Sequence, residues 1–217
     1  MFSFRQHRDQ QEKFEMGIDQ KFESDLDAFK KACLRILPSL QPADFDLIMP
    51  YLHRRYYDKG DLILSANEVC EKIFFLNTGF VRMYYLDDNG NQINYRFTES
   101  GNFFVDFQSF LTKKPSRFYW EAMQKIEVIT IVDQAVQEIY LASNTWNNFG
   151  RLMAEQVYLQ LNERVEMLLF MQPEARYLQM LSKYPNITNQ LPQLHIASYL
   201  GIKPETLSRI RKRIVKR

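Results

Sequence analysis

The middle of the chain constrains the fold most, because it contains five short runs rich in β-branched and aromatic residues, each bounded by turn signals. The runs are KGDLILSA, KIFFLN, GFVRMYYL, QINYRFT and KIEVITIVD. In the fourth run, Ile93, Tyr95 and Phe97 alternate with polar residues, which is the period of a half-buried strand. The pair Asn89-Gly90 lies between two runs, where a tight hairpin requires positive φ. Short strands at this spacing predict a β-sandwich or a small barrel.

Helical patterns flank this β region on both sides. Before it, the apolar residues of segment 25–52 follow the helical repeat until Pro38 and Pro42 interrupt it, so we expect two helices there. After it, apolar residues recur at steps of three and four until Pro173, and they are Phe149, Met153, Val157, Leu161, Val165 and Leu168 or Leu169. This stripe predicts a long amphipathic helix that either packs on its own barrel or forms a coiled-coil-like homodimer seam. A shorter helix is expected at 174–184.

The C-terminal stretch LPQLHIASYLGIKPETLSRIRKRIVKR fits two short helices joined by a turn. Ala197 is small enough to let the two helices approach each other, and Gly201 supplies the backbone freedom that a tight turn requires. Pro204 suits the first position of the second helix, where its missing N–H costs nothing. Five apolar residues have the spacing to close a small shared core: Ile196, Leu200, Ile202, Leu207 and Ile210. The pattern predicts a helix-turn-helix with a basic second helix.

The second helix of such a motif places its N-terminal part in the major groove of DNA. Residues one turn apart project together, so Glu205, Ser208 and Arg209 are expected to form one exposed edge. An arginine can donate two hydrogen bonds to guanine, a glutamate can accept one from cytosine, and a serine can serve either role. Glu205 has an alternative role as an acid at a helix start, where it complements the helix dipole.

Basic residues concentrate near the end of the chain. From Arg176 onward, nine Lys or Arg residues stand against one acid, a net charge of +8, whereas the remaining residues sum to −6. A basic unit on a mildly acidic body favours a polyanion partner, although basic tails also serve solubility. Further candidate DNA-binding residues, several of them better placed for phosphates than for bases, are Lys203, Thr206, Arg211, Lys212, Arg213, Lys216 and Arg217.

The order of these segments, with ETLSR on the last helix, resembles the CRP/FNR family of bacterial transcription regulators from about Phe22 onward. Glu205, Ser208 and Arg209 match the family's E-x-x-S-R recognition pattern, which in FNR-like members reads TTGA-type half-sites. The resemblance implies a homodimer on a two-fold-symmetric operator in double-stranded DNA, with RNA polymerase as a further candidate partner.

An α+β fold class with four parts follows from these patterns and from the resemblance. A polar N-terminal extension at 1–21 precedes a β-roll or jelly-roll barrel with flanking helices at 22–142, which resembles cyclic nucleotide-binding sensor domains. The dimerisation helix is expected at 143–172 and the helix-turn-helix domain at 173–217. The sequence ends at Arg217, so we expect no room for the β-wing that usually follows the recognition helix in the family.

Two departures from the family pattern bear on the effector. Family members that bind cyclic nucleotide carry a Gly-Glu pair and a later Arg followed by Ser or Thr. Val105 and Asp106 stand at the first pair, and Ser116 and Arg117 stand in reverse order at the second. Without the glycine, backbone N–H groups cannot approach a phosphate closely, and a one-residue shift on a strand turns a side chain to the opposite face. Asp106 and Arg117 remain candidate effector-binding residues, but the sequence disfavours cyclic AMP and implies no resident cofactor.

The sequence gives little support for an iron–sulfur cluster or a metal site as the sensor. Cys33 and Cys70 are too few for an iron–sulfur cluster, and His7, His53 and His195 are scattered. We expect His195 to lie at the surface or to contact phosphate. The aromatic residues Phe103, Phe104, Phe107, Tyr119 and Trp120 could line an apolar pocket or simply pack in the core.

The class of protein is limited by what the sequence lacks. No apolar run approaches the roughly 20 residues that span a bilayer, and the first residues lack the apolar centre of a signal peptide, so a cytoplasmic location is expected. A cupin-like barrel enzyme is a distant alternative, but the expected strands contain no histidine for a metal. Another alternative is a regulatory interaction module that does not bind DNA. The ordered ETLSR face argues against this alternative.

Overall fold

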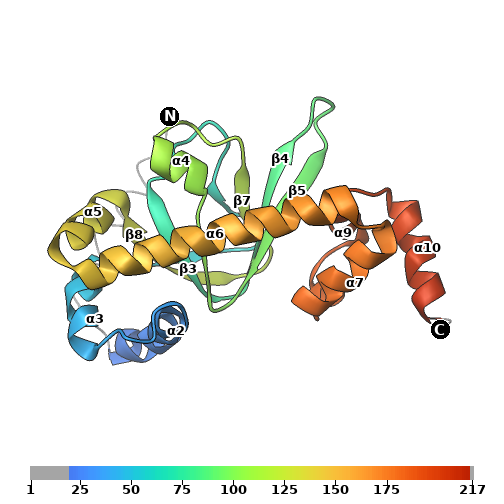
Figure 1. Ribbon diagram of the computed structural model, residues 1–217. Helices are drawn as coiled ribbons and strands as arrows, with labels where there is room; N and C mark the ends of the chain where they lie inside the picture. The colour runs from blue at the N-terminus through green and yellow to red at the C-terminus, as the bar shows by residue number, and fades with distance from the viewer. Residues whose placement is uncertain (1–19, 216–217) are drawn as a thin grey trace.

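The computed structural model describes residues 20–215 (Figure 1). The helices are α2 (Gln20–Ile36), α3 (Pro42–Ile48), the 3-10 turn η2 (Met49–Tyr51), α4 (Phe107–Thr112), α5 (Asp133–Ala142), α6 (Asn144–Phe170), α7 (Pro173–Lys183), α8 (Ile187–Gln190), α9 (Gln193–Leu200) and α10 (Pro204–Val215). The strands are β1 (His53–Tyr57), β2 (Leu62–Leu64), β3 (Lys72–Thr78), β4 (Phe80–Leu86), β5 (Gln92–Glu99), β6 (Asn102–Phe104), β7 (Tyr119–Ala122) and β8 (Ile126–Val132). Apart from its last two residues, the extension expected at 1–21 lies outside the described residues.

The strands form two four-stranded sheets in the orders β1-β8-β3-β6 and β2-β7-β4-β5, and the paired strands are antiparallel. This arrangement confirms the predicted β-sandwich or barrel. The sequence patterns did not reveal β1, β6 and β7. The last two are three and four residues long, which is too short to display alternation, and β1 is rich in basic residues.

The connection between β4 and β5 is the expected tight hairpin turn, closed by hydrogen bonds from the Gly90 N–H to the Asp87 carbonyl (2.9 Å) and from the Asp87 N–H to the Asn91 carbonyl (3.0 Å). Only Gly90 has positive φ, at 78°, whereas Asn89 does not. The Asp87 carboxylate accepts hydrogen bonds from the backbone N–H groups of Asn89 (3.0 Å) and Asn91 (2.8 Å), which stabilise the turn. The expected positive φ is therefore present at Gly90 and absent at Asn89.

Helix α6 runs across the molecule from α5 and α3 at one end to the C-terminal helices at the other (Figure 1). Its start is fixed to α3 by a 2.8 Å hydrogen bond from the Trp146 indole to the Asp44 carbonyl. The residues of the expected apolar stripe differ in burial between the two halves of this helix. Phe149 is buried and Met153 and Val157 are half-buried against the barrel, whereas Leu161 and Val165 are exposed. The stripe thus packs on its own barrel in its first half only.

Two hydrophobic cores hold the fold together. The first fills the barrel and joins it to α2, α3, α5 and the first half of α6. The second joins α7, α8, α9 and α10 to Met167 of α6, and it also contains Phe80 and Phe97 from strands β4 and β5. The Phe97 ring lies 4.9 Å from the Tyr199 ring of α9, centre to centre. The C-terminal helices are therefore packed directly on the barrel.

Candidate nucleic-acid interface

The helix-turn-helix predicted from the sequence is present as α9 and α10. Gly201 ends α9 in the left-handed conformation, with φ of 66°. Its N–H donates to the Ser198 carbonyl (3.1 Å), and the Ile202 N–H donates to the Ala197 carbonyl (3.0 Å). The Lys203 carbonyl then accepts the first hydrogen bonds of α10. Glycine is required here because other residues adopt this backbone region only with strain.

The inner face of the motif closes a small core as expected. Ala197, Leu200, Leu207 and Ile210 are buried, and Ile202 packs against them while partly exposed. Because these apolar residues fix how α10 is rotated about its axis, they also determine which of its side chains face outward.

The outward edge of α10 carries the residues expected to read bases. Glu205 and Arg209 are exposed, and Thr206 and Ser208 are partly exposed. The only hydrogen bond found for the Arg209 guanidinium among the described residues is a long one, at 3.5 Å, to the Thr206 hydroxyl. These side chains are thus positioned beside one another with their polar groups directed away from the core; their contact with bases stays a prediction.

The expected phosphate anchors are not equivalent. Lys203 and Lys212 are exposed and Arg211 is partly exposed. Arg213 is exposed but forms an ion pair with Glu174 of α7, so a phosphate would have to compete with that carboxylate. Lys216 and Arg217 lie outside the described residues.

His195 is not at the outer surface of the motif, which corrects the sequence expectation. Its Nδ1 lies 3.0 Å from the Arg82 guanidinium and 3.2 Å from the Asn94 amide, both on the β4–β5 hairpin. Arg82 is 3% exposed and forms a 2.6 Å ion pair with Glu121. Burial, followed by the charge of Arg82, holds the pKa of His195 below its usual range, and Glu121 partly opposes this shift. The sequence could not show that this face of α9 meets the barrel.

A second polar contact joins α9 to the same hairpin. The Ser198 hydroxyl accepts a 2.8 Å hydrogen bond from the Asn94 N–H and donates one of 3.2 Å to the Gln92 carbonyl. The first helix of the motif is therefore held against the barrel by hydrogen bonds as well as by the shared core.

The two candidate effector residues of the barrel have separate surroundings. Asp106 is buried and caps α4, accepting a 3.2 Å hydrogen bond from the Ser109 N–H. Arg117 is exposed, and the neighbouring Ser116 is the residue turned inward, with its hydroxyl accepting from the Phe118 N–H at 2.9 Å. No hydrogen bond or ion pair between Asp106 and Arg117 is found within the described part of the chain.

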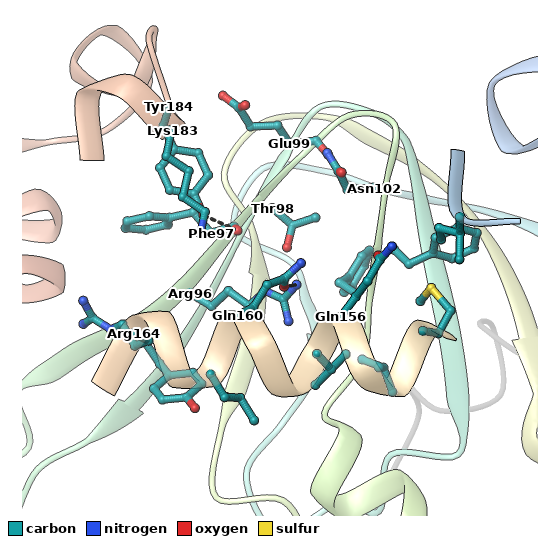
Figure 2. Close-up of a pocket in the computed structure, with 18 of the residues that line it drawn as sticks. Arg96, Phe97, Thr98, Glu99, Asn102, Gln156, Gln160, Arg164, Lys183 and Tyr184 are labelled. Atoms are coloured by element: carbon teal, nitrogen blue, oxygen red, sulfur yellow. Dashed lines mark hydrogen bonds between the residues drawn. The ribbon is translucent and has the colours of Figure 1, made fainter. Parts of the chain in front are cut away.

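A cavity of about 460 Å³ lies elsewhere, between β5, β6 and α6 on one side and the ends of α7 and α9 on the other (Figure 2). Neither Asp106 nor Arg117 lines it. Of the aromatic residues considered from the sequence, Phe103 and Phe104 reach its wall, although Phe104 also packs on Trp120 in the core. Sequence reasoning missed this site, because it depends on how α6 and the C-terminal helices pack on the barrel.

Comparison with known proteins identifies a domain family and a relative that part of this chain resembles. The family model of the cyclic nucleotide-binding domain matches residues 54–143. The cAMP-activated global transcriptional regulator Vfr of Pseudomonas aeruginosa is 32% identical over 65 residues, which is 30% of this chain and 30% of Vfr. The matched segment thus spans less than a third of that relative's length.

Solved structures extend the likeness to most of the chain. FixK2 from Bradyrhizobium japonicum has a TM-score of 0.66 at 18% identity, covering 76% of this chain and 85% of FixK2. A structure described as a regulator of the CRP/FNR family, from Eubacterium rectale, has a TM-score of 0.64 at 21% identity, covering 85% of this chain and 88% of that one. The chain has the CRP/FNR fold.

The CRP/FNR fold confirms the predicted fold class of a barrel, a long helix and a C-terminal helix-turn-helix. Vfr and the Eubacterium rectale protein are each described as a transcription regulator, so these comparisons give no support to the cupin-like alternative. Within residues 20–215, no group of three or more His, Cys, Asp or Glu residues could hold a metal ion. In the same residues, no helix has the length and hydrophobicity needed to cross a membrane.

Proposed function

We propose that this chain is a DNA-binding transcription regulator of the CRP/FNR type that reads a palindromic operator with TTGA-like half-sites through α10. The observation that carries this proposal is the edge of α10, where Glu205, Ser208 and Arg209 face outward while Leu207 and Ile210 close the core on the other side. An outward arginine, serine and glutamate on a rigidly held helix suit direct readout of the major groove.

The chemical roles follow from the side chains. Arg209 donates two hydrogen bonds to O6 and N7 of a guanine, and Glu205 accepts one from N4 of a cytosine. Lys203, Arg211 and Lys212 contact phosphates and set the register of α10 on the duplex. Arg213 joins them only after its pairing with Glu174 is broken.

A homodimer through the helix at 143–172 is the second part of the proposal, since a palindromic operator requires two copies of α10. The support is an exposed apolar row on the second half of α6, formed by Tyr158, Leu161, Val165 and Leu168 at steps of three, four and three. This is the spacing of a coiled-coil seam. Two copies joined there place two barrels and two motifs about one axis, which agrees with the division into 22–142, 143–172 and 173–217.

The proposed regulator does not depend on cyclic AMP, because Val105 and the Ser116-Arg117 order replace the groups that would hold a cyclic phosphate. The alternative is a version gated by a cyclic nucleotide or another small anion near Asp106 and Arg117. It is favoured by the match of residues 54–143 to the cyclic nucleotide-binding domain and by the name of Vfr, a cAMP-activated regulator. If the regulator acts as an activator, RNA polymerase is its partner in either version.

Selection of bound sequences from a random DNA pool, with and without cyclic AMP, tests the proposal. We expect the full chain to enrich a TTGA-like palindrome equally under both conditions. Enrichment only with cyclic AMP would support the gated alternative. Enrichment of no sequence under either condition would contradict sequence-specific recognition. The Arg209→Ala variant is the control, because it should bind DNA without enriching the same half-site.

A further inference from the structure

Arg176 of α7 lies where the C-terminal ends of two other helices meet. Its Nε donates to the Met171 carbonyl (2.9 Å), and its two Nη atoms donate to the carbonyls of Leu168 (2.8 Å) and Leu200 (3.0 Å). Leu168 belongs to the last turn of α6, Met171 follows that helix, and Leu200 is the last residue of α9. One planar guanidinium is therefore hydrogen-bonded to the long helix and to the helix-turn-helix at the same time.

The charge of Arg176 is unfavourable in its own helix and favourable for the other two. Because α7 begins at Pro173, Arg176 is its fourth residue and lies near the positive end of that helix dipole, where a cation is disfavoured. The C-terminal ends of α6 and α9 are the negative ends of their dipoles. Among the described side chains, no carboxylate oxygen lies within 4.0 Å of the guanidinium. The carbonyl groups of two helix ends thus take the part of a counter-ion.

The last carbonyls of α9 show how strongly its end depends on the neighbouring helices. The final four carbonyls of any α-helix lack partners within the helix. In α9, the first two of these accept from backbone N–H groups of the turn that follows. The carbonyl of Tyr199 accepts from Arg164 of α6, and that of Leu200 accepts from Arg176. Because α10 begins at Pro204, these two arginines hold α9 directly ahead of the helix proposed to read DNA.

Other contacts that would fix α6 relative to the motif are few. Among the described residues, Met167 is the only buried side chain of α6 in the second hydrophobic core. Only Met171 and Gln172 separate α6 from α7, and both have an extended backbone. A short connection of this kind can absorb a change in the angle between two helices. The hydrogen bond from Arg176 to the Met171 carbonyl restrains this connection directly.

We propose that Arg176 is a positioning residue that fixes the distance and rotation of α10 relative to α6. In a dimer paired along α6, these two quantities determine the spacing of the half-sites, because both copies of α10 must enter the major groove at once. One base pair of spacer shifts a half-site by about 3.4 Å and turns it by roughly 34°. This inference rests on the proposed homodimer and operator, and it assigns Arg176 no contact with DNA.

Operators that differ only in spacer length test the effect on recognition. The full chain is titrated with two TTGA-like half-sites at the preferred spacing and at spacings one base pair longer and shorter. We expect Arg176→Gln to reduce the discrimination between spacings by about threefold to tenfold, because a glutamine amide cannot join the three carbonyls. Base preference within each half-site should be retained. Equal weakening at every spacing would show that Arg176 only stabilises the fold and would overturn the proposal.

A second variant and a control accompany this experiment. Arg176→Lys keeps the charge and the aliphatic stem but replaces the planar set of donors with a compact ammonium group. It should therefore remain folded, with nearly the thermal midpoint of the unmodified chain, and still relax the spacing preference. Arg151→Gln is the matched control, because Arg151 is an exposed arginine of α6 that pairs with Glu155 on the same helix. It should keep the spacing preference. Unchanged spacing preference in both Arg176 variants would overturn the proposal.

A distance measurement without DNA separates this inference from the proposed function. Nitroxide labels are attached to Leu159→Cys on α6 and Lys212→Cys on α10, which are exposed positions, whereas Cys33 and Cys70 are buried. Excess unlabelled chain ensures that most measured pairs lie within one chain. We expect one narrow distance with Arg176 present and a broader or shifted distribution in Arg176→Gln. An unchanged distribution would overturn the inference even for a chain that reads a palindrome. If the chain enriches no palindrome, the labels still decide whether Arg176 fixes α10.

Discussion

Among the described residues, the Arg209 guanidinium makes only a long hydrogen bond to the Thr206 hydroxyl, so it is free to reach a base. We expect Arg209→Ala to cost about 1–3 kcal/mol of operator binding and to relax selectivity at one base pair in each half-site. Competition binding against operators with single substitutions measures both effects. If affinity for random DNA falls by the same amount, Arg209 contacts phosphate and not a base.

Mutation of Glu205 distinguishes base recognition from general attraction between charges, because Glu205 is the one acid among the basic residues of α10. Removal of a carboxylate from a surface that faces phosphates need not weaken binding, so Glu205→Ala should broaden specificity at nearly unchanged overall affinity. The matched control is Lys212→Ala, which should weaken every sequence alike and reduce the salt dependence of binding. A Glu205→Ala variant with unaltered half-site preference would assign Glu205 to the helix dipole instead.

His195 makes the docking of α9 sensitive to pH. Its pKa is lowered by burial and by Arg82, so the docked state favours the neutral ring, whereas an undocked ring titrates at its usual value of about 6.5. Above that value both states are neutral, and the docking is fully stable. As the pH falls from about 6.5 to the lower pKa of the docked ring, the undocked state binds the proton more readily and docking weakens.

The groups facing His195 are Arg82, Asn94 and Glu121, and only Glu121 favours its protonation. The thermal midpoint of the chain should therefore fall more on acidification than that of His195→Gln, which cannot titrate. If the thermal midpoints of the two proteins fall in parallel as the pH is lowered, protonation of His195 is not coupled to the docking of α9.

At the level of the helices, the joint between α5 and α6 depends on Gly150. A Cβ at this position would overlap the Tyr140 ring and its hydroxyl. Gly150→Ala should therefore destabilise the chain by about 1–3 kcal/mol, even though alanine is the better helix former. Denaturant unfolding measures the loss. A second substitution, Tyr140→Ala, should make Gly150→Ala nearly harmless, and additive losses in the double variant would contradict a direct clash.

The elements also show where sequence reasoning succeeds. The turn at Gly201, the inner face at Leu207 and the long helix ending before Pro173 depend on residues close together in the chain, and all were predictable. Strands β6 and β7 were not, because three or four residues are too few to show a period. His195 and the cavity at Arg96 were misjudged or missed because their surroundings come from segments about 100 and 60 residues away. Such contacts leave no local pattern in the sequence.

At the scale of the whole molecule, the exposed row on α6 predicts self-association. Val165 is 51% exposed at the centre of this row, so a charge there would be buried without a partner in a dimer. Val165→Glu should shift the chain toward monomer in sedimentation and weaken operator binding together with it. Leu159→Glu is the matched control, since Leu159 is exposed one position away from the row. A Val165→Glu chain that sediments as the unmodified one does would exclude this seam.

The core that holds the C-terminal helices also contains Phe80 and Phe97 of the barrel, and this limits how the molecule can be recombined. A chimera joined at the end of α6 would separate these two rings from Tyr184 and Tyr199 and leave apolar surface facing water on both pieces. A graft that replaces only α10 keeps that surface covered, provided that positions 207 and 210 stay apolar. New operator preferences are thus best installed within one helix, whereas sensor exchange requires the barrel and its docked helices to be transferred as one unit.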